Sequence, residues 1–146
     1  MSDFVHLHLH SEYSLLDGAI RLMQNVLSDK ESDKILHVSP LCDALKEMGM
    51  NAVAITDHGN LYGVHTFVSA MRDHGIKPII GSEFYVADNL YVKTPENLHK
   101  RDHLILLAKN LTGYKNLMKL STISFVDGFY MKPRIDLDTL EKYSEG

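Results

Sequence analysis

The fold class follows from the stretch N-A-V-A-I-T-D-H-G, which occupies residues 51–59. Residues 51–56 form a short apolar run, which is typical of a strand buried on both faces. The turn residues that follow interrupt this run, and apolar residues at helical spacing then continue over residues 62–74. A buried strand, a polar turn and a helix in this order are typical of an α/β fold.

The same alternation extends along the chain in both directions. The patterns predict strands over residues 4–9, 51–56, 77–86 and 103–108, helices over residues 19–27, 40–48, 62–74, 114–124 and 138–143, irregular segments over residues 28–34 and 88–102, and an extended segment over residues 129–135. This order predicts mostly parallel pairing, as in an α/β barrel or an open sheet. Because a closed (β/α) barrel takes about 250 residues, we expect residues 1–146 to be one piece of a larger domain.

The composition excludes several classes of protein. The chain has 146 residues, of which 45% are hydrophobic and 23% are charged, and these fractions are ordinary for a soluble globular domain. One cysteine rules out a disulfide framework, and the free thiol suits a reducing cytoplasm. A net charge of −4 argues against bulk attraction to DNA, so any contact with nucleic acid has to be local. No apolar run approaches the length of a membrane span.

The first candidate site is a row of histidines, His6, His8 and His10, separated by Leu7 and Leu9. On a strand these imidazoles share one face and stand about 6.6 Å apart, while the leucines point into packing. Imidazole is a good ligand for zinc, manganese or iron, which favours a metal site. The alternative is that the histidines face solvent or are held by hydrogen bonds.

Five more residues are candidates from their positions. Asp57 and His58 leave the end of a buried strand, where parallel α/β folds bind ligands, or they belong to an ordinary turn, in which Asp and Gly are common. Glu83 is a carboxylate inside an apolar strand, so it either bridges metal ions or faces water on an edge strand. Asp17 either returns to the same cleft or is only a turn residue. His103 is the least secure candidate, because it begins a strand instead of ending one.

Taken together, five segments resemble one family. The stretches are F-V-H-L-H-L-H-S-E-Y-S-L-L-D-G-A at residues 4–19, I-T-D-H-G-N-L-Y-G at residues 55–63, I-K-P-I-I-G-S-E-F-Y-V at residues 76–86, H-L-I-L-L-A-K-N-L-T-G-Y-K-N-L-M-K-L at residues 103–120 and G-F-Y-M-K-P-R-I-D at residues 128–136. They resemble the N-terminal polymerase and histidinol phosphatase (PHP) domain of bacterial DNA polymerase III alpha subunits. Residues 25–40 depart from this likeness as a small insertion.

The resemblance implies a truncated, distorted (β/α)₇ barrel that binds up to three divalent metal ions, zinc or manganese being usual. The ligands that it implies are His8, His10, Asp17, His58, Glu83 and His103. Glu83 would bridge two metal ions, and Glu83 and Asp17 would be the catalytic carboxylates. Further ligands of the family would lie beyond residue 146. Two arginines are candidates for contacts with the DNA backbone, although ordinary surface charge is the simpler interpretation; they are Arg101 and Arg134.

The resemblance also implies a function for the protein that contains this chain. That protein would be a cytoplasmic DNA-directed DNA polymerase, acting on a primer-template, whose PHP domain removes nucleotides from 3′ ends. Its partners would be the proofreading exonuclease subunit and other replicase subunits, with no membrane association. The alternatives are a scaffold that docks the proofreading subunit, and a free-standing PHP phosphatase. We expect this chain alone to be inactive.

Overall fold

The computed structural model describes residues 4–27, 35–97 and 99–146. Along the chain the elements are β1 (Gln24–Leu27), β2 (Ile35–Val38), α1 (Pro40–Glu47), β3 (Ala52–Ile55), α2 (Val64–Asp73), β4 (Lys77–Val86), a 3₁₀ turn (Pro95–Asn97), β5 (Asp102–Leu107), α3 (Leu111–Val126), β6 (Arg134–Ile135) and α4 (Leu137–Lys142). They form two compact units. The first unit contains residues 1–55 and 62–79, and the second contains residues 56–61 and 80–146.

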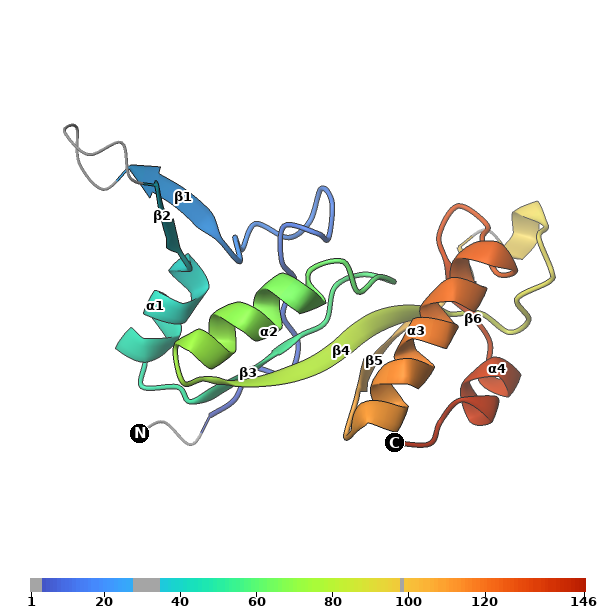
Figure 1. The fold of residues 1–146 in the computed structure, drawn as a ribbon. Coiled ribbons are helices and arrows are strands. Elements are labelled where there is room, and N and C mark those ends of the chain that lie inside the picture. The colour runs from blue at the N-terminus through green and yellow to red at the C-terminus, as the bar shows by residue number, and fades with distance from the viewer. Residues whose placement is uncertain (1–3, 28–34, 98) are drawn as a thin grey trace. The chain divides into compact units, whose positions relative to one another are not determined.

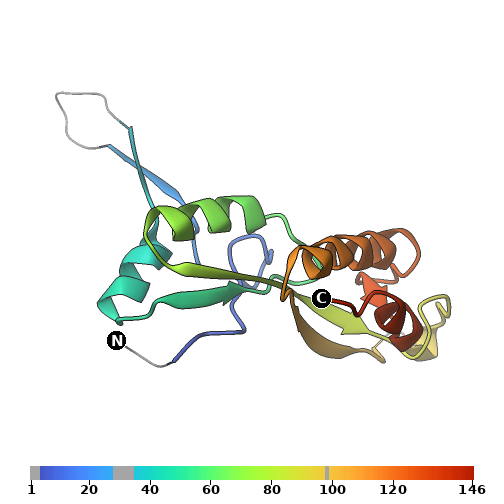
Figure 2. The same ribbon diagram turned by 60° about the horizontal axis from the view of Figure 1, so that its bottom comes forward.

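The first unit packs α1 and α2 with strand β3, over which α2 runs (Figures 1 and 2). Helix α1 has proline at its first position and is followed by Gly49, whose φ is 68°, as the sequence predicts. The thiol of Cys42 in α1 points at the carbonyl of Ala70 in α2, with 3.6 Å between sulfur and oxygen. All four residues of β3 are buried, so the prediction of a doubly covered strand is confirmed.

The prediction of a helix over residues 19–27 is wrong. Residues 24–27 form β1, which pairs antiparallel with β2 from Gln24 opposite Val38 to Leu27 opposite Ile35. Local spacing of apolar residues does not show a partner strand that comes later in the chain, and the ladder with that partner overrides the local pattern. The predicted loop at residues 28–34 lies outside the described residues.

The predicted strand at residues 4–9 is reduced to one bridge. His6 pairs with Val53, and its carbonyl accepts a hydrogen bond of 2.8 Å from the amide of Ala54. Leu9 is buried as expected, but Leu7 is 47% exposed. Because the segment has only one bridging residue, it does not keep the strict alternation of faces of a pleated strand.

In the second unit, α3 lies on one face of β4 and of the strands beside it (Figures 1 and 2). Its core joins Phe84 of β4, Leu117 and Leu120 of α3, and Ile135 of β6. Strand β6 runs parallel to β4, with Tyr85 opposite Arg134. Helix α3 begins three residues before the predicted start because the side chain of Asn110 accepts hydrogen bonds from the first-turn amides. The described residues between 88 and 101 are irregular apart from the 3₁₀ turn, as predicted. In the segment 129–135, which the sequence predicts to be extended, residues 134–135 form a strand but residues 130–132 form a tight turn.

Strand β5 corrects the prediction of mostly parallel pairing, because it runs antiparallel to β4, with Gly81 opposite Leu107 and Val86 opposite Asp102. Parallel neighbours need a crossover, usually a helix, whereas the described part of residues 87–101 contains only the short 3₁₀ turn and folds back on the same edge. The sheet orders its strands β3-β4-β5, with β6 also beside β4, and it is small and open. The chain is therefore mixed α/β.

Candidate metal centre

Strand β4 places Glu83 between two other segments of the second unit. On one side, the Glu83 amide donates to the Asp57 carbonyl over 3.0 Å and the Gly59 amide donates to the Glu83 carbonyl over 2.7 Å, which sets His58 opposite Glu83. On the other side, β5 sets His103 opposite Tyr85. Residues opposite each other share a face, as do residues two apart on one strand. His58, Glu83 and His103 therefore project on the same face of the sheet.

The side chains of these three residues meet at one oxygen. The Nδ1 atom of His103 lies 2.5 Å from Oε1 of Glu83, and the Nδ1 atom of His58 lies 3.3 Å from the same oxygen. The carboxylate is 1% exposed, whereas the imidazoles of His58 and His103 are 20% and 55% exposed. The group, which we call the Glu83 cluster, is thus a buried carboxyl group whose two histidine neighbours are partly exposed to solvent.

Tyr85 orients both histidines, and sequence reasoning missed it. Its ring stacks on His58, with centroids 5.8 Å apart and planes 14° apart, and it meets His103 edge-on with centroids 4.8 Å apart. The signal in the sequence is its position two residues after Glu83 on a predicted strand, which puts both side chains on one face.

The turn that carries His58 is held by polar groups that sequence reasoning also missed. The hydroxyl of Ser82 donates to the carbonyls of Asp57 and Asn60, over 2.9 and 3.2 Å. The side-chain amide of Asn60 donates to the carbonyl of His58 over 3.0 Å. Gly59 has a φ of 62°, a left-handed conformation that favours glycine. The T-D-H-G motif is therefore a rigid turn that fixes the position of the imidazole.

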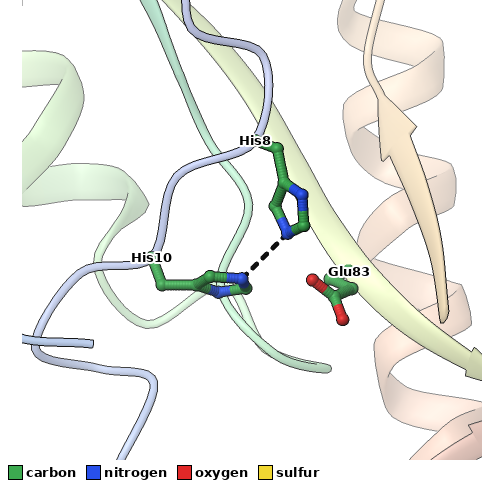
Figure 3. A group of neighbouring side chains, drawn as sticks. All are labelled: His8, His10 and Glu83. Atoms are coloured by element: carbon green, nitrogen blue, oxygen red, sulfur yellow. Dashed lines mark hydrogen bonds between the residues drawn. The ribbon is translucent and has the colours of Figure 1, made fainter. Parts of the chain in front are cut away.

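The first unit contains a second histidine pair. The Nε2 atoms of His8 and His10 lie 2.9 Å apart (Figure 3), and Nδ1 of His10 lies 3.2 Å from the hydroxyl of Ser14. Glu83, also drawn in Figure 3, comes from strand β4 of the second unit. His6 takes no part in the pair, because its ring packs edge-on against Phe4. Asp17 is exposed and lies in a turn, and its backbone amide donates to the carbonyl of Ser14.

Beside the histidine pair lies a cavity of about 780 Å³. His8 and His10 line one side, and apolar residues of α1, including Leu41 and Leu45, line another. The pair therefore faces open space within its own unit, where a ligand can reach it.

A sequence profile of the PHP domain matches residues 28–146 of the chain. The chain belongs to the PHP domain family. It is 48% identical to the DNA polymerase III subunit alpha of Borreliella burgdorferi, covering 99% of the chain and 11% of the relative. It is 46% identical to the subunit of the same name from Aquifex aeolicus (99% and 12% covered) and 41% identical to that from Thermus aquaticus (98% and 11%). The chain spans about a tenth of the length of these curated relatives.

The side chains gathered in this PHP chain are of the kinds that bind divalent metal ions. Ligand atoms about 2.1 Å from a tetrahedral metal ion lie about 3.4 Å from one another. The separations of 3.3 Å between His58 Nδ1 and Glu83 Oε1, and of 2.9 Å between the Nε2 atoms of His8 and His10, are close to this value. The 2.5 Å between His103 Nδ1 and Glu83 Oε1 is shorter and is the length of a direct hydrogen bond. Imidazole nitrogen with carboxylate oxygen is a donor set that suits zinc, manganese or iron.

The two arginines expected at the substrate site have different environments. Arg101 is half-buried, and its guanidinium carbon lies 5.6 Å from the centre of the Tyr85 ring. Arg134 is 1% exposed, so the interpretation of Arg134 as surface charge is wrong. Its guanidinium donates to the carbonyls of Gly128, Leu90 and Val92. Burial lowers the pKa of Arg134, but the three carbonyls stabilise the charge.

Among the described residues, no helix combines the length and the apolar character needed to cross a lipid bilayer.

Proposed function

We propose that this chain is the metal-binding part of a DNA polymerase III alpha subunit, and that its PHP domain hydrolyses phosphodiester bonds at the 3′ end of a DNA primer. The observation that carries the proposal is the Glu83 cluster, in which two imidazole nitrogens approach one buried carboxylate oxygen. The names of the curated relatives support the polymerase part of the proposal.

The proposed ligands are His58, Glu83 and His103 from the second unit, with His8, His10 and Asp17 as further ligands on the strength of the family resemblance. Zinc and manganese are the proposed metals. When bound, a divalent metal ion supplies positive charge for the phosphate oxygens and lowers the pKa of a coordinated water.

The side chains of the cluster have separate tasks in this proposal. An ionised carboxylate as buried as that of Glu83 is costly unless cations compensate it, so Glu83 would be the residue that holds the metal ion most firmly. His58 and His103 remain partly exposed and leave a path by which a phosphodiester reaches the centre. Tyr85 restricts the rotation of both imidazoles, which keeps their nitrogens on Glu83. Asp17 is the proposed second catalytic carboxylate.

The proposed partners follow from the same assignment. They are a DNA primer-template, the proofreading exonuclease subunit and other replicase subunits, in the cytoplasm. Polymerisation itself, a nucleotidyl transfer, belongs to parts of the protein outside this chain, and we propose that the chain by itself has no nuclease activity.

The experiment compares Glu83→Gln with Glu96→Gln in the intact polymerase subunit. Glu96 is exposed in the 3₁₀ turn and serves as a control for the same chemical change. Bound metal is measured by plasma mass spectrometry, and nucleotide release is measured on a primer labelled at its 3′ end. We expect Glu83→Gln to lose at least one metal ion and about 100-fold or more of the nuclease rate, with Glu96→Gln unchanged.

Three results would overturn the proposal: a wild-type protein without metal, a metal content unaffected by Glu83→Gln, or a metal-loaded protein without nuclease activity. The double variant His8→Ala/His10→Ala tests the scaffold alternative. Loss of nuclease activity at unchanged thermal stability supports catalysis. Loss of both thermal stability and binding of the proofreading subunit favours the scaffold.

A further inference from the structure

Two cations lie against the aromatic ring that orients the Glu83 cluster. The Nζ atom of Lys132 and the guanidinium carbon of Arg101 each lie 5.6 Å from the centre of the Tyr85 ring. Tyr85 is 5% exposed, and the same ring contacts both histidines of the cluster. The two cations and the two imidazoles therefore share one aromatic ring, which both cations approach closely enough for cation–π attraction.

The backbone holds Lys132 in this place. The amide of Tyr130 donates to the carbonyl of Lys132 over 3.0 Å and closes a tight turn around Met131, whose φ is 60°. A left-handed conformation costs a residue other than glycine about 1–2 kcal/mol, so the rest of the unit has to maintain it. The next residue, Pro133, is buried, and a Cβ added at Gly59 in the His58 turn would meet its ring at 2.8 Å. Lys132 is thus anchored next to the turn that carries His58.

The charge of Lys132 is available to a ligand. Its side chain is exposed, and within residues 4–27, 35–97 and 99–146 it forms no ion pair with a carboxylate. Arg101 immediately precedes β5 and is two residues from His103, so the strand that presents the histidine also presents this guanidinium. The two cations therefore reach the Tyr85 ring from two different segments, the residue before β5 and the turn before β6.

We propose that Lys132 and Arg101 form a seat for the phosphate group of the substrate beside the Glu83 cluster. Lysine supplies a compact point charge and arginine a planar fork of donors, and both hold phosphate oxygens through charge-assisted hydrogen bonds. In phosphoryl transfer such cations position the group and neutralise charge that develops on it. The inference rests on the proposed function, because it assigns a task to residues beside that centre. It adds Lys132, a position that the family resemblance does not assign.

The test titrates inorganic phosphate into the intact polymerase subunit in the presence of zinc and follows the ³¹P linewidth. The variants are Lys132→Met, the conservative Lys132→Arg, and Lys46→Met as a control at an exposed lysine of α1. We expect Lys132→Met to raise the Kd for phosphate about tenfold, since one charge-assisted contact is lost. Lys132→Arg should stay within about threefold of wild type, because the charge remains. Lys46→Met should bind phosphate like wild type.

The metal content of each variant is measured in the same samples. Weaker phosphate binding by Lys132→Met at unchanged metal content supports the seat. Phosphate binding equal to wild type in Lys132→Met overturns it, and so does a loss of metal in that variant or a failure of Lys132→Arg to restore binding. A protein that binds phosphate through Lys132 but releases no nucleotides contradicts the proposed function and leaves the seat standing.

Discussion

Replacing Arg134 by methionine tests whether this residue supports the fold instead of contacting DNA. Arg134 is 1% exposed and lies at the start of β6. Its Nε donates to the carbonyl of Gly128 over 3.0 Å, and its Nη2 donates to the carbonyls of Leu90 and Val92 over 3.1 and 3.3 Å. The guanidinium therefore ties two irregular segments to the sheet.

The expected loss follows from these three contacts. A hydrogen bond to a charged group contributes about 1.5–3 kcal/mol, and a buried carbonyl left without its donor is costly in addition. Methionine fills much of the space, and the desolvation of the guanidinium, the main cause of the lowered pKa of Arg134, disappears with the charge. The net loss expected for Arg134→Met is therefore about 3–5 kcal/mol, the range for breaking a buried charged contact.

Urea denaturation followed by circular dichroism measures this loss, with Arg72→Met as the control. Arg72 is exposed on α2, and its substitution should change the unfolding free energy by less than about 0.5 kcal/mol. Arg134→Lys keeps the charge with fewer donors and should fall between wild type and Arg134→Met. An Arg134→Met protein as stable as wild type that binds DNA more weakly would refute the structural assignment.

Two further predictions concern stability in the second unit. Burial raises the pKa of Asp136, but hydrogen bonds from Thr139 and from the Leu90 amide outweigh it, so the pKa is lowered. The contribution of the ionised Asp136 to stability is therefore complete above about pH 4 and declines as the pH falls further. Asp136→Asn should therefore flatten the unfolding free energy plotted against pH below about pH 4, and an unchanged acid limb would contradict this. Gly128→Ala places a Cβ 1.9 Å from the carbonyl oxygen of Arg134 and should lower the unfolding free energy by about 1–3 kcal/mol, measured by thermal unfolding. An unfolding midpoint equal to that of wild type would contradict this prediction.

Much of the local structure could be predicted from the sequence. The end signals at Pro40 and Gly49 and the apolar run before Asp57 predicted α1 and β3 correctly. The predicted bounds of β4 coincide with the observed ones. These features depend on residues close together in the chain, where capping, φ preferences and burial act directly.

The pairing of distant segments could not be predicted in the same way. Residues 24–27 lie in a strand because β2 pairs with them, and no residue within that segment specifies the partner. The role of His103 depends on direction. In a parallel sheet the start of a strand lies far from the ends of its neighbours, which made His103 the least secure candidate. Because β5 is antiparallel to β4, its start lies beside the end of β4, and His103 reaches Glu83.

The sequence by itself determined which residues are candidates for the site: histidines in a row, a histidine in a polar turn and a carboxylate within an apolar strand are recognisable by residue type and spacing. Only the tertiary structure decided which of them meet, that Tyr85 orients His58 and His103, and that Arg134 is buried while Lys132 lies beside the cluster. Residue type sets what a side chain can bind, whereas strand direction and register set which side chains share a face.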